Sequence, residues 1–235
     1  VYLPDVTAIG SMYPEWLGYG AGVTHYMAVP DLPLDSKGTE FDLPGGVIMG
    51  GDLGSFRPIE RFDDPLFQAK VEESVAHAWY EGDWQKHPWE EEMPRPKYTD
   101  FQDDGKYSWV KAPRFEGKAM QVGPLAQILM GYASGHELIT KHVNDSVALA
   151  SSIAKVKIPL AALHSTPGRD IARAIRWALV AEVSFKQWGL LVGNIAKGDT
   201  AIFNEPVFPR GEQRGFGFHE APRGTLSHWI VIRDG

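Results

Sequence analysis

The sequence of 235 residues contains no cysteine. These residues therefore offer no disulfide bond, no thiolate nucleophile and no sulfur ligand for a metal. Long apolar runs are missing as well, because none approaches the roughly 20 residues that a membrane-spanning helix needs. For this stretch of polypeptide the sequence excludes a disulfide-stabilised scaffold and a membrane span.

Basic residues are outnumbered by acidic ones. The chain has 23 Lys and Arg against 30 Asp and Glu, a formal net charge of −7. Nucleic acids and anionic membranes are bound by basic faces, so neither is expected as the main partner. The first residues, Val1 to Asp5, resemble the interior of a protein, so we expect the chain to be a segment of a longer polypeptide.

Standard motifs for metal, nucleotide and hydrolase sites are missing. His136 and His142 are six residues apart, whereas two histidines on one helical face that bind zinc are separated by four. The stretch 18–25 lacks the spacing of a dinucleotide-binding loop, and Ser134 is one residue away from the nucleophile position of a hydrolase elbow. The acidic run 90–92 is interpreted as solvated surface charge.

The first half of the chain has few clear elements. Glycine and proline are frequent in 1–62, which predicts irregular structure with one short strand at 46–49. A helix is predicted over 64–82, with Asp64 as the N-cap and apolar residues recurring every four positions. The following segment, 83–114, is rich in proline and charge and is expected to be a long surface excursion ordered by its aromatic residues.

Helical patterns dominate the second half. Helices are predicted at 123–135 and 136–155, and the longest helix follows Ser165 or Thr166 as cap and runs to about residue 191. Its arginines are expected to form a basic face opposite an apolar one. Together these patterns favour an α+β fold that is predominantly helical, with long core helices and small peripheral strands, in a single domain.

The last 21 residues, GFGFHEAPRGTLSHWIVIRDG, contain the most specific local signal. Pro222 fixes its own φ and favours an extended Ala221, while Gly224 allows a sharp turn behind Arg223. A rigidly presented guanidinium suits an anionic ligand or a developing negative charge. The alternative is a surface ion pair of Arg223 with Glu220 or another carboxylate. The closing Asp-Gly pair predicts a hairpin whose partner strand would follow it.

Six blocks in register closely resemble the large subunit of nickel-iron hydrogenases, and the form FHEAPRG is most similar to the membrane-associated, hydrogen-uptake branch. The blocks are VEESVAHAWYEG, HPWEEEMPRPKYTD, YSWVKAPRFEGKAMQVGPLAQILMGY, LHSTPGRDIARA, NIAKGD and the stretch that ends the chain. The resemblance implies reversible oxidation of dihydrogen at a nickel-iron centre, with cyanide and carbon monoxide on the iron. In the family, thiolates of two C-x-x-C motifs hold the metals, and electrons pass to a small subunit with iron-sulfur clusters.

What the resemblance implies for this chain follows from the missing cysteines. Residues 1–235 are expected to be the central part of a single large-subunit domain, truncated at both ends and inactive alone. The protein is expected to be bacterial and to reach the membrane, facing the periplasm, only through its small subunit. The alternative from another class is a non-catalytic structural subunit, or a relic of the same fold without metals.

The resemblance also assigns roles to five residues. Arg223 matches the arginine that overhangs the open side of the metal centre, where electrostatic positioning is its expected main role and assistance in proton removal a second. Ala221 and Pro222 would line the same wall. Lys111 and Glu73 match the outer shell of a structural magnesium site, with Glu72 as the other candidate for the glutamate. The plain alternative for these charges is a helix surface.

Overall fold

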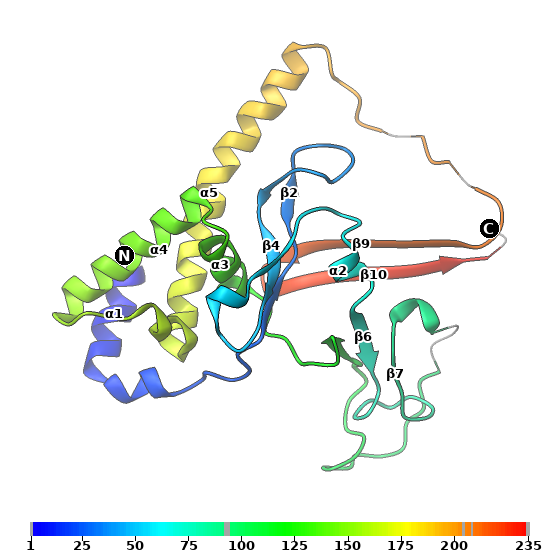
Figure 1. The fold of residues 1–235 in the computed structure, drawn as a ribbon, viewed down its shortest axis with the longest axis horizontal. Helices are drawn as coiled ribbons and strands as arrows, with labels where there is room; N and C mark the ends of the chain where they lie inside the picture. Colours follow the sequence, from blue (N-terminus) through cyan, green and yellow to red (C-terminus); the bar gives the residue numbers. More distant parts are fainter. Residues whose placement is uncertain (1, 92–94, 204, 208, 234–235) are drawn as a thin grey trace.

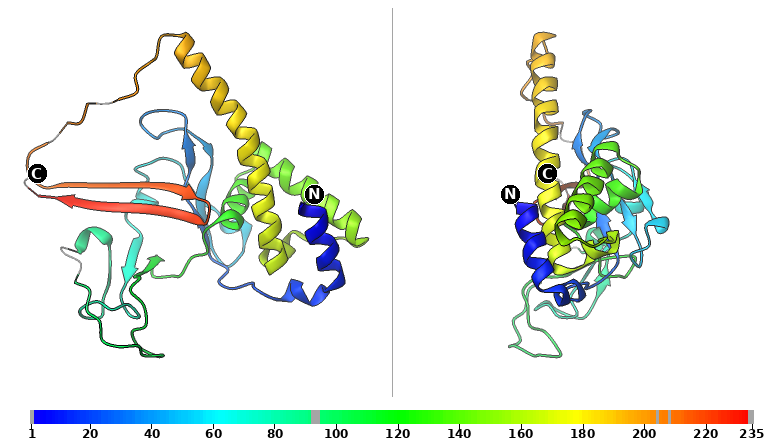
Figure 2. Two further views of the ribbon diagram at one scale, coloured as in Figure 1. Left: turned by 180° about the vertical axis from the view of Figure 1, so that it is seen from behind. Right: turned by 90° about the vertical axis from the view of Figure 1, so that its left-hand side faces the viewer.

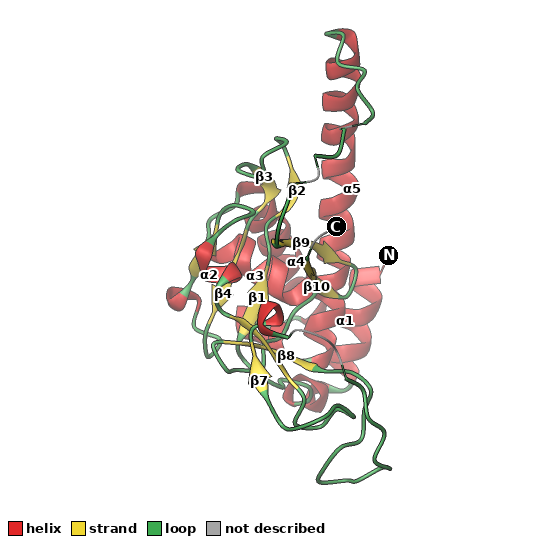
Figure 3. Ribbon diagram, turned by 90° about the vertical axis from the view of Figure 1, so that its right-hand side faces the viewer, coloured by secondary structure: helices red, strands yellow, loops and turns green. Residues whose placement is uncertain are grey.

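The computed structural model describes residues 2–91, 95–203, 205–207 and 209–233. The longer helices gather on one side of the molecule, whereas the strands, most of the loops and one short helix lie on the other (Figures 1 and 3). The helices are α1 Tyr2–Met12, α2 Pro65–Gln68, α3 Pro124–Ala133, α4 Glu137–Ala154 and α5 Thr166–Ala196. The α+β class expected from the sequence is confirmed.

The strands form small sheets. A three-stranded sheet has the order β1-β4-β5 and another β7-β6-β8, while β2 pairs with β3 and β9 with β10, always antiparallel. Their bounds are β1 Tyr26–Ala28, β2 Asp31–Pro33, β3 Phe41–Leu43, β4 Gly45–Ile48, β5 Arg57–Ile59, β6 Val71–Ser74, β7 Gln85–Lys86, β8 Ala112–Phe115, β9 Gln213–Ala221 and β10 Gly224–Ile232.

The three helices predicted in the second half are confirmed close to their expected bounds. Ser165, rather than Thr166, caps α5, because its side chain accepts a hydrogen bond from the backbone N–H of Gly168. The His136 side chain caps α4 in the same way, and α4 ends at Lys155 in the left-handed conformation. The apolar periodicity of the three helices and the capping signal of α5 are local, which explains why the sequence locates these helices well.

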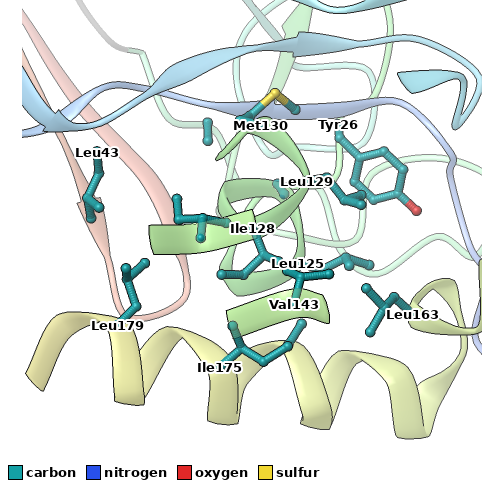
Figure 4. Packing of buried hydrophobic residues seen from close by; sticks show 14 of the residues in the cluster. Tyr26, Leu43, Leu125, Ile128, Leu129, Met130, Val143, Leu163, Ile175 and Leu179 are labelled. Carbon is teal, nitrogen blue, oxygen red and sulfur yellow. The ribbon is translucent and has the colours of Figure 1, made fainter. Parts of the chain in front are cut away.

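The hydrophobic core lies around α3, which contacts both α4 and α5. Figure 4 shows Ile175 and Leu179 of α5 and Val143 of α4 directed at Leu125 and Ile128 of α3. Helix α1 lies beside α4 and α5 in both views of Figure 2. No helix in the described ranges is long and apolar enough to cross a membrane. The first half of helix α5 packs into this core, whereas its second half projects beyond the other elements (Figure 1).

The helix predicted over 64–82 is wrong. Asp64 caps a helix as expected, but α2 ends at Gln68, and Val71 already belongs to strand β6. The apolar residues spaced four apart are buried as predicted, yet β6 pairs with β7 and β8 instead of continuing a helix. Pairing with strands distant in sequence outweighs a helical period that only one short capped turn supports.

The irregular structure predicted for 1–62 is also wrong in part. This region contains α1 and five strands, and the strand expected at 46–49 is β4, the middle strand of its sheet. Its glycines serve close packing: a Cβ on Gly45 would lie 2.3 Å from the backbone nitrogen of Pro30. A side chain at this position would force the backbones apart, which is why glycine here is compatible with a strand.

The segment 83–114 is largely a surface excursion, as predicted. Trp79 packs edge-on against Tyr98 and Trp109, with ring centroids 4.9 and 5.0 Å apart. A second aromatic group links this region to the hairpin, where Phe216 stacks on Trp229 at 4.9 Å and Trp89 meets Trp229 at 5.0 Å. These aromatic contacts hold strands β9 and β10 against the rest of the sheet-rich side.

Candidate functional site

The hairpin of β9 and β10 positions the candidate site. Ala221 pairs with Gly224, so Pro222 and Arg223 are the two residues of the turn between the strands. Gly224 has a φ of +139°, and a Cβ there would lie 2.4 Å from Cγ2 of Val122 and 2.8 Å from the backbone nitrogen of Gly123. The predicted sharp turn behind Arg223 is therefore present, and only glycine fits it. The hairpin partner of the final strand precedes it in sequence, while the partner expected after Asp234 and Gly235 lies outside the described residues.

The strands on both sides of the turn are anchored from within. The Arg176 side chain of α5 donates hydrogen bonds of 2.9 Å to the carbonyl oxygens of Ala221 and Glu220. Oε1 of Glu220 accepts from the backbone N–H of Val29 at 2.9 Å and from the hydroxyl of Thr225 at 2.5 Å. These contacts tie the turn to α5 and to the end of β1.

The turn exposes Arg223 to solvent, with Pro222 exposed and Ala221 half-buried. Within the described residues the Arg223 guanidinium makes no hydrogen bond or ion pair. The predicted alternative of an Arg223–Glu220 ion pair is wrong, since Glu220 is only 4% exposed and its carboxylate is directed inward, to Val29 and Thr225. The guanidinium is thus available to a group outside these residues.

Glu220 has an unusual electrostatic environment. Burial raises the pKa of its carboxyl from 4.5 to about 7, with the nearby Asp31 carboxylate adding to the rise. The hydrogen bonds from Thr225 and Val29 and the charge of Arg176 lower this pKa, but only in part. Glu220 therefore changes protonation near neutral pH, three residues before Arg223.

A second cluster surrounds Lys111. Its ammonium group makes ion pairs with Glu73 and, at 2.6 Å, with Glu91, and it lies 5.7 Å from the ring centroid of Tyr80. Burial alone would lower the pKa of Lys111, but the hydrogen bonds and charges of the two carboxylates outweigh it and raise the pKa. The structure brings Lys111 together with Glu73, whereas the Glu72 side chain accepts from Gln85 at 2.7 Å instead. Both glutamates lie on strand β6, so the helix-surface alternative for them is wrong.

Two residues of these clusters were not predicted. Glu91 belongs to a run interpreted as solvated charge, yet its side chain is only 8% exposed because Lys111 draws it inward. The sequence predicts that the arginines of α5 form a basic face opposite an apolar one, yet Arg176 is buried and the neighbouring Trp177 is 61% exposed. The reason in both cases is a partner distant in sequence, and no local pattern indicates it.

The described part of the chain holds no metal-binding group of three or more His, Cys, Asp or Glu. His136 caps α4 and contacts the carbonyl of Asp42, while His142 pairs with Glu182 at 3.0 Å. Each of these histidines thus has a partner within the chain itself. With no cysteine in the sequence, thiolate ligands are missing too.

Comparison with known proteins gives a consistent picture. A family model described as nickel-dependent hydrogenase matches residues 1–235. The chain is 43% identical over 236 residues to the hydrogenase-2 large chain of Escherichia coli (strain K12) and 36% identical over 260 residues to the uptake hydrogenase large subunit of Azotobacter chroococcum mcd 1. Each alignment covers all of this chain but 41% and 42% of those proteins.

Solved structures agree with the sequence comparison. The Ni-Fe-Se hydrogenase of D. vulgaris Hildenborough in the reduced state is similar with a TM-score of 0.66 at 25% identity, and the [NiFeSe]-hydrogenase of Dm. baculatum with 0.68 at 25%. Both matches cover 99% of this chain and 44% of the other. The chain thus spans about two fifths of the length of the proteins it matches.

Proposed function

Because this chain belongs to the nickel-dependent hydrogenase family, we propose that the whole protein catalyses the reversible oxidation of dihydrogen to protons and electrons. In this proposal residues 1–235 are the central part of a single large-subunit domain. The observation that carries the proposal is the Pro222–Arg223 turn, which presents a solvent-exposed guanidinium from a hairpin anchored by buried polar groups.

The described residues do not themselves fit a nickel-iron centre. They contain no thiolate and no group of metal-ligating side chains. Soft metals of this kind prefer thiolates. We therefore propose that cysteines outside these residues hold the nickel and the iron, the latter with cyanide and carbon monoxide, and that Ala221, Pro222 and Arg223 form one wall of the pocket. When bound, the centre supplies the redox chemistry.

Arg223 acts in this proposal through its charge and shape. A guanidinium is permanently cationic and presents a planar fork of donors, so it can hold an anionic group and stabilise negative charge that develops beside it. Because it does not give up its own proton readily, its main role is electrostatic positioning rather than that of a base. Within the described residues no carboxylate pairs with it and neutralises this charge.

Turnover of the Arg223→Lys variant tests the function. In the whole protein with its partner subunit, we expect hydrogen oxidation to fall at least about tenfold at full metal content, since lysine keeps the charge but loses the planar fork. Arg61→Lys is the matched control, because Arg61 is exposed and pairs with Asp63 on the surface. A normal rate in Arg223→Lys would refute the role of Arg223. A purified whole protein without nickel would instead favour the structural subunit or metal-free relic.

We propose a structural magnesium ion near Lys111 and Glu73. Both residues would belong to the outer shell of that ion. The cluster already contains an ammonium group between two carboxylates, so it suits residues that orient ligands and not ligands themselves. The pairing with Lys111 favours Glu73 over Glu72 in this role. Magnesium content should accordingly depend on Glu73 and not on Glu72.

The partner of this chain is proposed to be a small subunit that carries iron-sulfur clusters and takes the electrons. We further propose a bacterial protein that associates with the membrane, on the periplasmic side, through that subunit. Because the net charge is −7, this proposal includes neither a nucleic-acid partner nor direct binding to an anionic membrane. Dihydrogen is the substrate.

A further inference from the structure

Arg176 lies on the buried face of α5 and is only 8% exposed. Its two terminal nitrogens donate separately, Nη1 to the carbonyl of Ala221 and Nη2 to the carbonyl of Glu220, each at 2.9 Å. Both acceptors belong to the end of strand β9. One side chain of a long helix therefore holds two successive backbone carbonyls of the hairpin.

These two carbonyls belong to the residues directly before Pro222 and Arg223. Because proline has a fixed φ, the position of Ala221 largely sets the direction in which the chain enters the turn. On the other side of the turn, Gly224 is confined by Val122 and Gly123. The location of Arg223 is thus determined by backbone anchors, since its own side chain has no partner within the described residues.

The geometry of the anchor suits arginine. The two terminal nitrogens of its planar fork meet the two carbonyl oxygens at a fixed spacing, whereas the lysine ammonium is a point charge on a flexible stem. A buried guanidinium is costly unless nearby groups compensate its charge. Here Glu220 and Asp31 lie close to Arg176: burial raises the pKa of both carboxyls, and the charge of Arg176 offsets part of that rise. The Arg176 guanidinium therefore donates its hydrogen bonds to the two backbone carbonyls beside the turn and not to a carboxylate.

We propose that Arg176 is the positioning residue of the Pro222–Arg223 turn: by holding the carbonyls of Glu220 and Ala221, it sets where the Arg223 guanidinium lies. This inference rests on the proposed role of Arg223 and deepens it. If Arg176 acts through Arg223, its substitution has little left to disturb once Arg223 is already replaced.

A double-mutant cycle in the whole protein with its partner subunit tests this. We expect Arg176→Lys to lower turnover about tenfold, because small misplacements of a catalytic group cost one to two orders of magnitude. In the Arg223→Lys background the same substitution should change turnover less than about twofold. Amide hydrogen exchange of residues 213–226 should also be faster in Arg176→Lys, which reports the loosened turn without reference to activity.

Arg169→Lys is the matched control. Arg169 lies on the same helix and also donates two hydrogen bonds of 2.8 Å, but to the carbonyl of Ala21 and the side chain of Gln121 and not to the strands of the hairpin. Its effect on turnover should be the same with and without Arg223→Lys, and exchange in 213–226 should stay unchanged. If Arg176→Lys does not accumulate, Arg176→Gln, which keeps an amide donor, replaces it in the cycle.

Equal losses from Arg176→Lys in both backgrounds, or unchanged exchange in 213–226, would overturn the positioning role. Failure of the proposed function has a different signature. In that case Arg223→Lys alone would leave turnover normal, while faster exchange in Arg176→Lys would still show that Arg176 holds the turn.

Discussion

Glu220 lies buried beside the turn, yet its oxygen Oε2 has no hydrogen-bond partner among the described residues. Its other oxygen, Oε1, accepts two hydrogen bonds. A carboxylate with one unsatisfied buried oxygen is more costly than a carboxylic acid in the same place. The surroundings of Glu220 therefore favour binding of a proton to its carboxylate near neutral pH, which has a measurable consequence for stability.

We expect Glu220 to make the protein less stable as the pH rises. The folded-state pKa of about 7 lies above the ordinary value of 4.5, so the folded state binds the proton more tightly than the unfolded state does. Stability is thus lost from about pH 4.5 up to about pH 7, and the loss is complete above that, on the order of 3 kcal/mol. Glu220→Gln, which keeps the acceptor for Val29 and Thr225, should remove this loss.

Melting temperatures of the whole protein at pH 5 and pH 8 check this expectation. The drop between the two pH values should be smaller in Glu220→Gln than in the unaltered protein. Glu40→Gln, at an exposed carboxyl, serves as the control and should behave like the unaltered protein. Parallel drops in all three proteins would show that Glu220 does not titrate in this window.

At the scale of elements, strand β6 separates two adjacent glutamates. Successive side chains of a strand point to opposite faces. Glu73 accordingly meets Lys111, whereas Glu72 contacts Gln85 at an exposed position. A helix over the same residues, as the sequence pattern predicted, would not have separated them in this way, so the strand decides which glutamate can serve the proposed magnesium site.

Glu73→Gln and Glu72→Gln form a matched pair of variants on this strand. We expect Glu73→Gln to reduce the magnesium content of the purified whole protein and to lower its melting temperature, because Lys111 loses one of its two carboxylate partners. Glu72→Gln should change neither, since Glu72 is not part of the cluster. Metal analysis by mass spectrometry measures the first effect; equal magnesium in both variants would refute the assignment of Glu73.

At the scale of the whole molecule, the second half of α5 is apolar on surfaces that nothing in the described residues covers. Phe185 is 79% exposed, Trp188 66% and Ile195 53%, and this part of α5 projects beyond the other elements (Figure 1). Large exposed apolar side chains in such number favour association. In the proposed function, these side chains are expected to become covered when the 235 residues are part of the whole protein with its small subunit.

We expect the isolated segment to be inactive and self-associating. It has no cysteine to hold nickel and iron, so it should show no hydrogen-dependent dye reduction, and its exposed α5 should give polydisperse species in size-exclusion chromatography. Dye reduction by the segment alone, or a monodisperse monomer, would contradict this expectation.

The whole protein with its small subunit should be active and should sediment with membranes. A large subunit that remains on the membrane without its partner would contradict the proposed attachment.

The sequence by itself determined the features whose causes are local. The helical pattern located α4, the cap candidates Ser165 and Thr166 located the start of α5, and the order of proline, arginine and glycine located the turn at Arg223. Blocks of residues in register were enough to indicate the family. Such signals depend on neighbours within a few residues, so they survive without knowledge of the fold.

Only the tertiary structure decided what depends on distant partners. Strand β6 exists because β8, some 40 residues later, pairs with it, and Arg176 is buried because it reaches carbonyls of β9 that lie 44 and 45 residues away. The same holds for Glu91, whose burial depends on Lys111. The periodicity of a sequence indicates which residues are buried or charged, but it does not identify the distant group that a residue contacts. That distant group determines both the secondary-structure element and the role of the residue.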